Sequence, residues 1–157
     1  MKKWIWISIL IVVVLLGLTI KVYLKSVEPV KAAENRAISI AKEQIHLKSV
    51  SDFNLYNGSK SYSVVTGTSE EGQKLIIWVP EDNDNIIVRR ASEGITKEKA
   101  LEKVKSEKNP SNIISIRLGM ENNRPLWEIY YQTDKNLLNY YYIDFITGEW
   151  LKDIENL

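Results

Sequence analysis

The sequence predicts an α+β protein with one membrane helix at its N-terminus. First, the segment from Trp4 to Ile20 is seventeen residues long and holds no charged residue, which approaches the ~20 apolar residues that cross a bilayer. Second, the rest of the chain shows a helical pattern followed by strand-like stretches, and then the same order again. We therefore expect a transmembrane helix followed by two tandem units, each a helix packed on a small antiparallel sheet.

The flanks of the apolar run are those of a membrane anchor. Lysines stand on both sides of it, and Trp4, Trp6 and Tyr23 lie where interfacial aromatic residues belong. Two lysines stand on each side of the run, so the positive charges do not determine its orientation. We expect the short N-terminal tail to stay in the cytoplasm and residues 26–157 to be extracytoplasmic. The chain would then be a single-pass protein of the cell membrane. A cleaved signal peptide is the alternative, but its apolar core would be shorter, about 7–15 residues, and closely followed by a cleavage site.

The elements divide the chain into four parts: tail and anchor (1–25), a short tether (26–33), a first α+β unit (34–91) and a second α+β unit (92–157). Within the tether, Pro29 favours a helix start, and apolar residues recur at helical spacing from there into the first unit, as far as Ile45. Strands are then expected at 50–56, 61–67, 74–80 and 85–90. In the second unit, Thr96 is a natural N-cap for a helix that runs to Lys108, and strands are expected at 112–118, 125–132, 138–145 and 149–153.

The two units match in the order and spacing of their elements. Positions 62 and 64 match 127 and 129, and positions 75 and 77 match 140 and 142, all at an offset of 65; helix positions 37 and 41 match 100 and 104 at 63. We interpret this as the duplication of one unit of about 60 residues. Accidental similarity is the alternative.

Composition and charge exclude several classes of function. The chain has no Cys and one His, His46, which removes thiol catalysis and the usual zinc sites. The first 25 residues carry four lysines and no acid, leaving 17 basic and 20 acidic residues in the rest, a balance that does not favour nucleic acid. Ser39-x-x-Lys42 lacks the partner motifs of acyl transferases, and the acidic stretch 81–85 lacks the EF-hand pattern. We expect no catalytic residue, metal, cofactor or small-molecule substrate.

Aromatic residues are concentrated in two of the last strands. Trp127, Ile129 and Tyr131 share one face by alternation, and Tyr130 lies on the other. The same rule separates Tyr141 from its two tyrosine neighbours. We take Tyr130 and Tyr141 as candidate protein-interaction residues, since tyrosines often anchor interfaces; tyrosine pairs that only stabilise the sheet are the alternative.

The stretch 126–151 resembles the PepSY signature, in which a Trp-x-hydrophobic strand leads to a Tyr-rich strand and a hydrophobic-Asp-x-x-Thr-Gly turn. The matching residues are Trp127, Ile129, Tyr142, Ile143, Asp144, Thr147, Gly148 and Leu151. Together with the N-terminal anchor, the Val-Val-x-Gly-Thr stretch (64–68) and Trp78-Val79-Pro80, the whole chain resembles the TseB/YpmB-type cell-wall elongation regulators of Firmicutes.

This resemblance implies two PepSY-like, or cystatin-like, domains outside the membrane. It also implies a non-enzymatic role in regulating peptidoglycan elongation, through association with a penicillin-binding protein, a transpeptidase in the same membrane. Two alternatives remain: an inhibitor or propeptide-like module that acts on an extracellular protease, and an enzyme acting on cell-wall material, for which the sequence shows no site.

Overall fold

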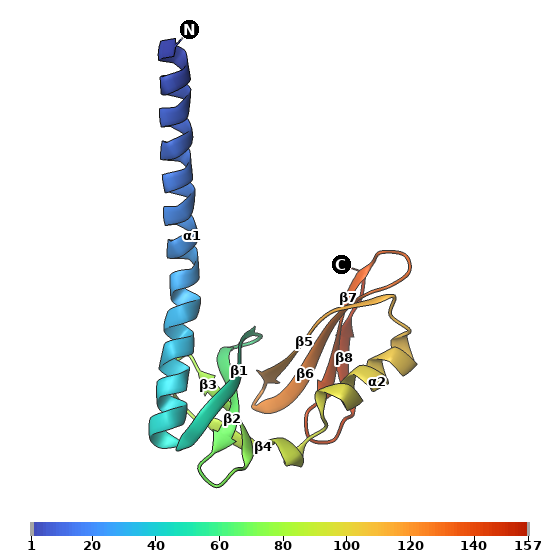
Figure 1. The fold of residues 1–157 in the computed structure, drawn as a ribbon. Helices are drawn as coiled ribbons and strands as arrows, with labels where there is room; N and C mark the ends of the chain where they lie inside the picture. Colours follow the sequence, from blue (N-terminus) through green and yellow to red (C-terminus); the bar gives the residue numbers. More distant parts are fainter. Residues whose placement is uncertain (1, 157) are drawn as a thin grey trace. The chain divides into compact units, whose positions relative to one another are not determined.

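The structure, a computed structural model, describes residues 2–156. It consists of a long helix, four strands, a short 3-10 helix, a second helix and four further strands (Figure 1). The elements in chain order are α1 (Lys2–Gln44), β1 (Leu47–Asn57), β2 (Ser61–Ser69), β3 (Lys74–Pro80), β4 (Ile87–Arg90), η1 (Ala91–Glu93), α2 (Lys97–Lys108), β5 (Asn112–Glu121), β6 (Arg124–Gln132), β7 (Leu138–Asp144) and β8 (Trp150–Ile154). The α+β class expected from the sequence is confirmed.

Helix α1 contains the apolar N-terminal run and continues beyond it. Among the described residues it is the one helix long and apolar enough to cross a membrane. Pro29 lies inside this helix and does not begin a new one, and residues 26–33, expected as a tether, are helical. A proline removes one backbone hydrogen bond, and the alanines and charged helix formers that follow it favour continuation.

The first unit is an antiparallel sheet in the order β1-β2-β3-β4. Its two faces have different partners, because successive side chains of a strand point to opposite sides. On one face, Val65 and Ile77 are fully buried against Ala37 and Ala41 from the end of α1. The opposite face, which carries Val64 and Trp78, packs against the second unit.

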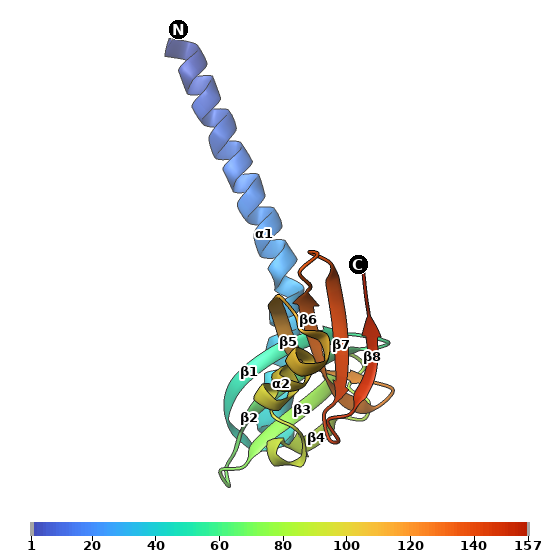
Figure 2. The same ribbon diagram turned by 90° about the vertical axis from the view of Figure 1, so that its right-hand side faces the viewer.

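The second unit repeats this plan with the order β5-β6-β7-β8. Helix α2 lies along one face of this sheet (Figures 1 and 2), where Ala100 and Val104 are fully buried. As expected, Thr96 caps its N-terminus, accepting a hydrogen bond from the Lys99 N–H at 3.3 Å. Asn109 ends the helix in the left-handed conformation, with φ 44°.

The two sheets share one hydrophobic core, and residues 36–157 form one compact body. Trp78 is fully buried in this core. Its indole N–H donates to the Gly119 carbonyl of the second unit at 2.9 Å, and its ring meets Phe145 edge-on, with centroids 5.7 Å apart. Tyr56 packs on Gly119 so closely that a Cβ there would lie 2.4 Å from the tyrosine ring. Each unit therefore completes the core of the other.

The structure corrects the offset between the two units in their inner strands. Val65 pairs with Ile77, and Ile129 pairs with Tyr141; each pair lies on the face that its unit's helix covers. Equivalent positions are therefore 64 residues apart in these strands, and the expected offset of 65 was wrong by one. Because side chains alternate, a slip of one residue assigns every side chain to the opposite face.

The outer strands of both sheets are short or irregular. Strand β4 has four residues. Register shifts interrupt the pairing of β1 near Leu47 and Val50, of β5 between Ile113 and Ser115, and of β7 with β8 between Tyr142 and Ile143. Each of the four edge strands therefore has an interrupted register or only four residues.

Candidate functional site

The Asp-x-x-Thr-Gly segment forms the tight turn between β7 and β8. The side chain of Asp144, which is 3% exposed, accepts hydrogen bonds from the backbone N–H groups of Ile146 at 2.8 Å and Thr147 at 2.6 Å. Its second carboxylate oxygen accepts from Nε of Arg124. Gly148 takes the left-handed conformation, with φ 72°, which glycine adopts without strain. The signature residues therefore build a turn.

Hydrogen bonds lower the pKa of two carboxyl groups, Asp144 in the turn and Glu107 on α2. Burial alone would raise the pKa of Asp144, but the Thr147 N–H and the Arg124 guanidinium outweigh it, and the pKa lies below its usual value. The hydroxyl of Tyr141, on β7, donates to Glu107 of α2 and lowers the pKa of that carboxyl group. Both carboxylates are thus better stabilised in the folded protein than in the unfolded chain.

Acid should therefore destabilise the protein. A carboxylate whose folded pKa is depressed contributes stability above its unfolded pKa, about 4, and loses it as pH falls through the folded value. We expect the free energy of unfolding, from urea titrations of the full-length protein in detergent micelles, to fall between about pH 5 and pH 3. Asp144→Asn should reduce this slope. An unchanged slope in that variant would assign the acid sensitivity to other carboxylates.

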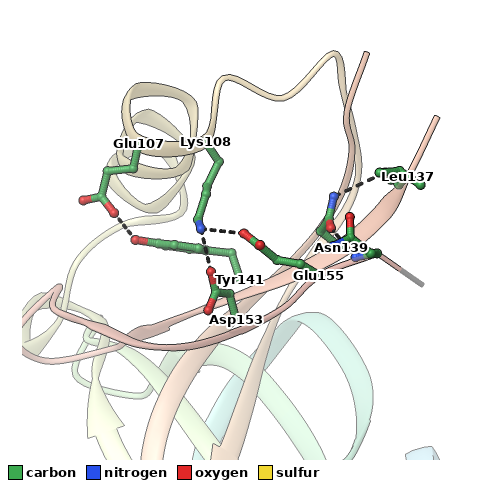
Figure 3. A network of polar contacts seen from close by, with 8 residues as sticks. Glu107, Lys108, Leu137, Asn139, Tyr141, Asp153 and Glu155 are labelled. Atoms are coloured by element: carbon green, nitrogen blue, oxygen red, sulfur yellow. Dashed lines mark hydrogen bonds and ion pairs between the residues drawn. The ribbon is translucent and has the colours of Figure 1, made fainter. Parts of the chain in front are cut away.

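Trp127 and Tyr141 join the second sheet to the segment around α2. The Trp127 indole N–H donates to the Ile95 carbonyl at 3.0 Å, and Tyr141, which is fully buried, reaches Glu107 near the end of the helix (Figure 3). Burial and the Glu107 carboxylate raise the pKa of Tyr141, so its hydroxyl stays protonated and remains a donor. Trp127 of the signature and Tyr141, one residue before the signature's Tyr142, therefore serve packing.

A second polar contact holds strand β8 to the same helix end. Lys108 Nζ lies 2.5 Å from Asp153 and 2.8 Å from Glu155 (Figure 3), and these hydrogen bonds raise the pKa of the lysine. The amide oxygen of Asn139 accepts from the Asn156 N–H at 2.9 Å. The C-terminal segment is thus fastened at two points.

The two candidate interaction residues lie on opposite faces of the second sheet. Tyr141 is in the core under α2, so its expected place on the surface was wrong. Alternation separated Tyr141 from Tyr140 and Tyr142 but did not say which of them faces the helix, because that depends on the register with β6. Tyr130 is partly exposed on the other face, and its cross-strand partner is Tyr140, whose ring stacks on it with centroids 4.5 Å apart.

Tyr130 and Tyr140 belong to a row that crosses all four strands. Strand pairing places Ser115 opposite Tyr130, and Ile154 opposite Tyr140. Ser115 and Ile154 are exposed and the two tyrosines partly so. We call these four residues the tyrosine row. Tyr140 was not among the expected interaction residues; pairing the two strands across the turn at 133–137 would have placed it beside Tyr130.

The other sequence candidates have ordinary structural places. The Ser39 hydroxyl donates to Glu43 on the surface of α1. Asp82 accepts from the Asp84 N–H at 3.1 Å within its turn. His46 is exposed just after α1, in a left-handed conformation with φ 54°. Among residues 2–156, no group of three or more His, Cys, Asp or Glu side chains is arranged to hold a metal ion.

Comparison with known proteins places the chain in a family. A family model described as "Cell wall elongation regulator TseB-like domain" matches residues 36–80, and one described as "Peptidase propeptide and YPEB domain", PepSY, matches residues 94–154. The "Probable cell wall elongation regulator TseB" of Bacillus subtilis (strain 168) is 32% identical over 134 residues, 85% of this chain and 83% of that protein. The chain belongs to the TseB-like family.

A solved TseB-like structure has the same fold. The "YpmB protein from Bacillus subtilis" aligns with a TM-score of 0.71 and 34% identity, over 77% of this chain and 95% of that one. The two matched segments fall in the first and second units, respectively. The resemblance stated from the Trp127 and Asp144 motifs is thereby confirmed.

Proposed function

We propose that this protein is a membrane-anchored, non-catalytic regulator of cell-wall elongation that binds a penicillin-binding transpeptidase in the same membrane. The observation that carries the proposal is the 32% identity, over 85% of the chain, to a protein named as a probable regulator of this process. In this proposal the N-terminus is cytoplasmic, α1 anchors the chain, and residues 26–157 lie outside the cell membrane.

The contacts of Asp144 and Tyr141 favour a binding role over catalysis. Asp144 is held by two backbone N–H groups and Arg124, and the Tyr141 hydroxyl by Glu107. Groups fixed in this way serve to hold the turn and the helix. Asp144 and Tyr141 therefore stabilise the fold, and the exposed surface of that fold is available to bind a partner.

The tyrosine row is the surface that we propose for the partner. The rings of Tyr130 and Tyr140 stack with an interplanar angle of 16°, a contact that restricts the movement of both side chains. Rigid aromatic side chains bury large areas at a small entropic cost, which makes them frequent anchors of protein interfaces. Ile154, 41% exposed, extends the same row with apolar surface.

A photo-crosslinking experiment in living cells tests this assignment. A benzoylphenylalanine residue replaces Tyr130 in the full-length protein, and a matched protein carries it at Lys105, which is exposed on α2 over the opposite face of the sheet. We expect a penicillin-binding protein to be captured from position 130 and not from position 105. The double variant Tyr130→Ala/Tyr140→Ala should reduce co-purification of that protein by about tenfold, or ~1.4 kcal/mol.

The alternative outcomes are distinct. Equal capture from both positions would remove the tyrosine row as the contact surface. Capture of an extracellular protease that loses activity on binding would replace the proposal by the inhibitor-like alternative. Capture of neither class of protein from position 130 would contradict the proposed contact.

A further inference from the structure

A cleft of about 630 Å³ lies within residues 36–157, between the face of the first sheet that points away from α1 and the segment that leads into α2. Its size falls within the about 300–1,000 Å³ of typical ligand sites. It is separate from the tyrosine row, which contributes no lining residue. The two units thus form a second candidate binding site.

One wall of the cleft is a cross-strand row of the first sheet. Asp52 pairs with Thr66, and Thr66 pairs with Ile76, so the three side chains share one face. Lys74 lies on the same face, two residues before Ile76. This wall changes from acidic on β1 to apolar and basic on β3.

The floor of the cleft is apolar and comes from both units. Ile76 of the first unit and Phe145 of the second are buried there, at 3% and 1% exposure. Trp127 also lines it, with its ring held by the hydrogen bond to the Ile95 carbonyl. An apolar side chain of a ligand would gain stability by covering these rings and methyl groups.

The charges around the rim are arranged as a dipole. Lys74 and Lys97 lie toward the start of α2, and Asp52 lies on β1; none of the three forms an ion pair with any of residues 2–156. Glu98, also on the rim, bonds to its own backbone and to Thr96, and the positive charges of Lys97 and Lys74 help to lower the pKa of its carboxyl group. Arg117 is neutralised by Glu128 at 2.6 Å. The two lysines therefore outnumber Glu98 at one end of the rim and leave an excess of positive charge there, and Asp52 gives negative charge at the other end.

We propose that this cleft binds a short extended peptide segment of another protein, with an acidic residue beside Lys74 and Lys97, apolar side chains on the floor and a basic residue beside Asp52. Two strand spacings and two residues along β3 separate Asp52 from Lys74, roughly 12 Å. An extended chain covers this distance in about three or four residues. The proposal is independent of the identity of the cell-wall partner.

Fluorescence anisotropy with labelled peptides tests the proposal on the full-length protein in nanodiscs. The probe is the fluorescein-labelled peptide Gly-Glu-Leu-Phe-Lys-Gly amide. The control peptides replace either both charged residues by Gln or both apolar residues by Gly. We expect the probe to bind at least about tenfold more tightly than either control, and to weaken as salt increases, because rim charges are screened.

Charge reversal on the protein gives the matched comparison. Lys74→Glu/Lys97→Glu should weaken binding of the probe about tenfold, and Asp52→Lys should also weaken it. Lys135→Glu changes an exposed lysine of the β6–β7 turn, outside the cleft, and should bind as the unchanged protein does. These exposed substitutions should leave the circular dichroism spectrum unchanged.

Three results would overturn the proposal: no peptide of the set binds, the probe binds no better than its controls, or the reversed variants bind it as tightly as the unchanged protein. Binding of a neutral N-acetylglucosamine oligosaccharide in place of the peptides would overturn the assignment of the ligand as a peptide.

Discussion

Replacing Trp78 with alanine should lower the free energy of unfolding by about 3–5 kcal/mol, the usual range for removing a fully buried aromatic side chain. The indole fills the space between the two sheets, with 0% exposure. The substitution also removes the donor to the Gly119 carbonyl and the edge contact with Phe145. Urea unfolding of the full-length protein in detergent micelles, followed by far-ultraviolet circular dichroism, measures the change.

Trp150 provides the matched control. It is 52% exposed on the last strand, so Trp150→Ala should change the free energy of unfolding by no more than about 0.5 kcal/mol. If the two substitutions had similar effects, the core shared by the two units would not be the main source of stability. If Trp78→Ala split the transition into two, the units would be folding independently.

Gly119→Ala should cost about 1–3 kcal/mol, because it adds a methyl group to a packed junction. The new Cβ would lie 2.4 Å from ring carbons of Tyr56. That ring is fixed from the other side: it is 1% exposed, and its hydroxyl donates to Glu121 at 3.0 Å. The clash must therefore be relieved by movement of one sheet relative to the other or by a strained ring.

A double-mutant cycle isolates this clash. Tyr56→Ala is destabilising by itself, but in its background the added methyl group of Gly119→Ala meets no ring. We expect the double variant to be more stable than the sum of the single effects by at least about 0.5 kcal/mol. Additive effects would mean that Tyr56 and position 119 do not press on each other. The same unfolding assay supplies all four values.

Local patterns were sufficient to predict most of the elements. The helix predicted from the Thr96 N-cap to Lys108 matches α2, and strand 74–80 was predicted at the residues of β3. These predictions succeeded because capping, turn residues and alternation act within a few residues of the chain. The motif around Asp144 identified the family for the same reason.

Features that depend on pairing between distant segments were less predictable. Alternation separates Tyr141 from Tyr140 but does not say which of them faces the helix; that requires the register with β6. Trp78 is buried because the second unit packs over it, where its indole donates to a carbonyl 41 residues away, and nothing local signals this contact. The cleft likewise depends on distant segments: the pairing of β1, β2 and β3 places Asp52 and Lys74 on one face of the first sheet, and the packing of the two units adds Lys97.

The short and interrupted edge strands have a consequence for how other proteins can attach. A long, flat edge is a template onto which a foreign strand adds through backbone hydrogen bonds, the route to sheet extension and aggregation. Here β4 ends in two arginines, β8 carries the charged residues Lys152 and Asp153 among its five residues, and β1 has two register shifts. These edges disfavour continuation of either sheet into another molecule, so recognition by side chains is favoured over recognition by backbone.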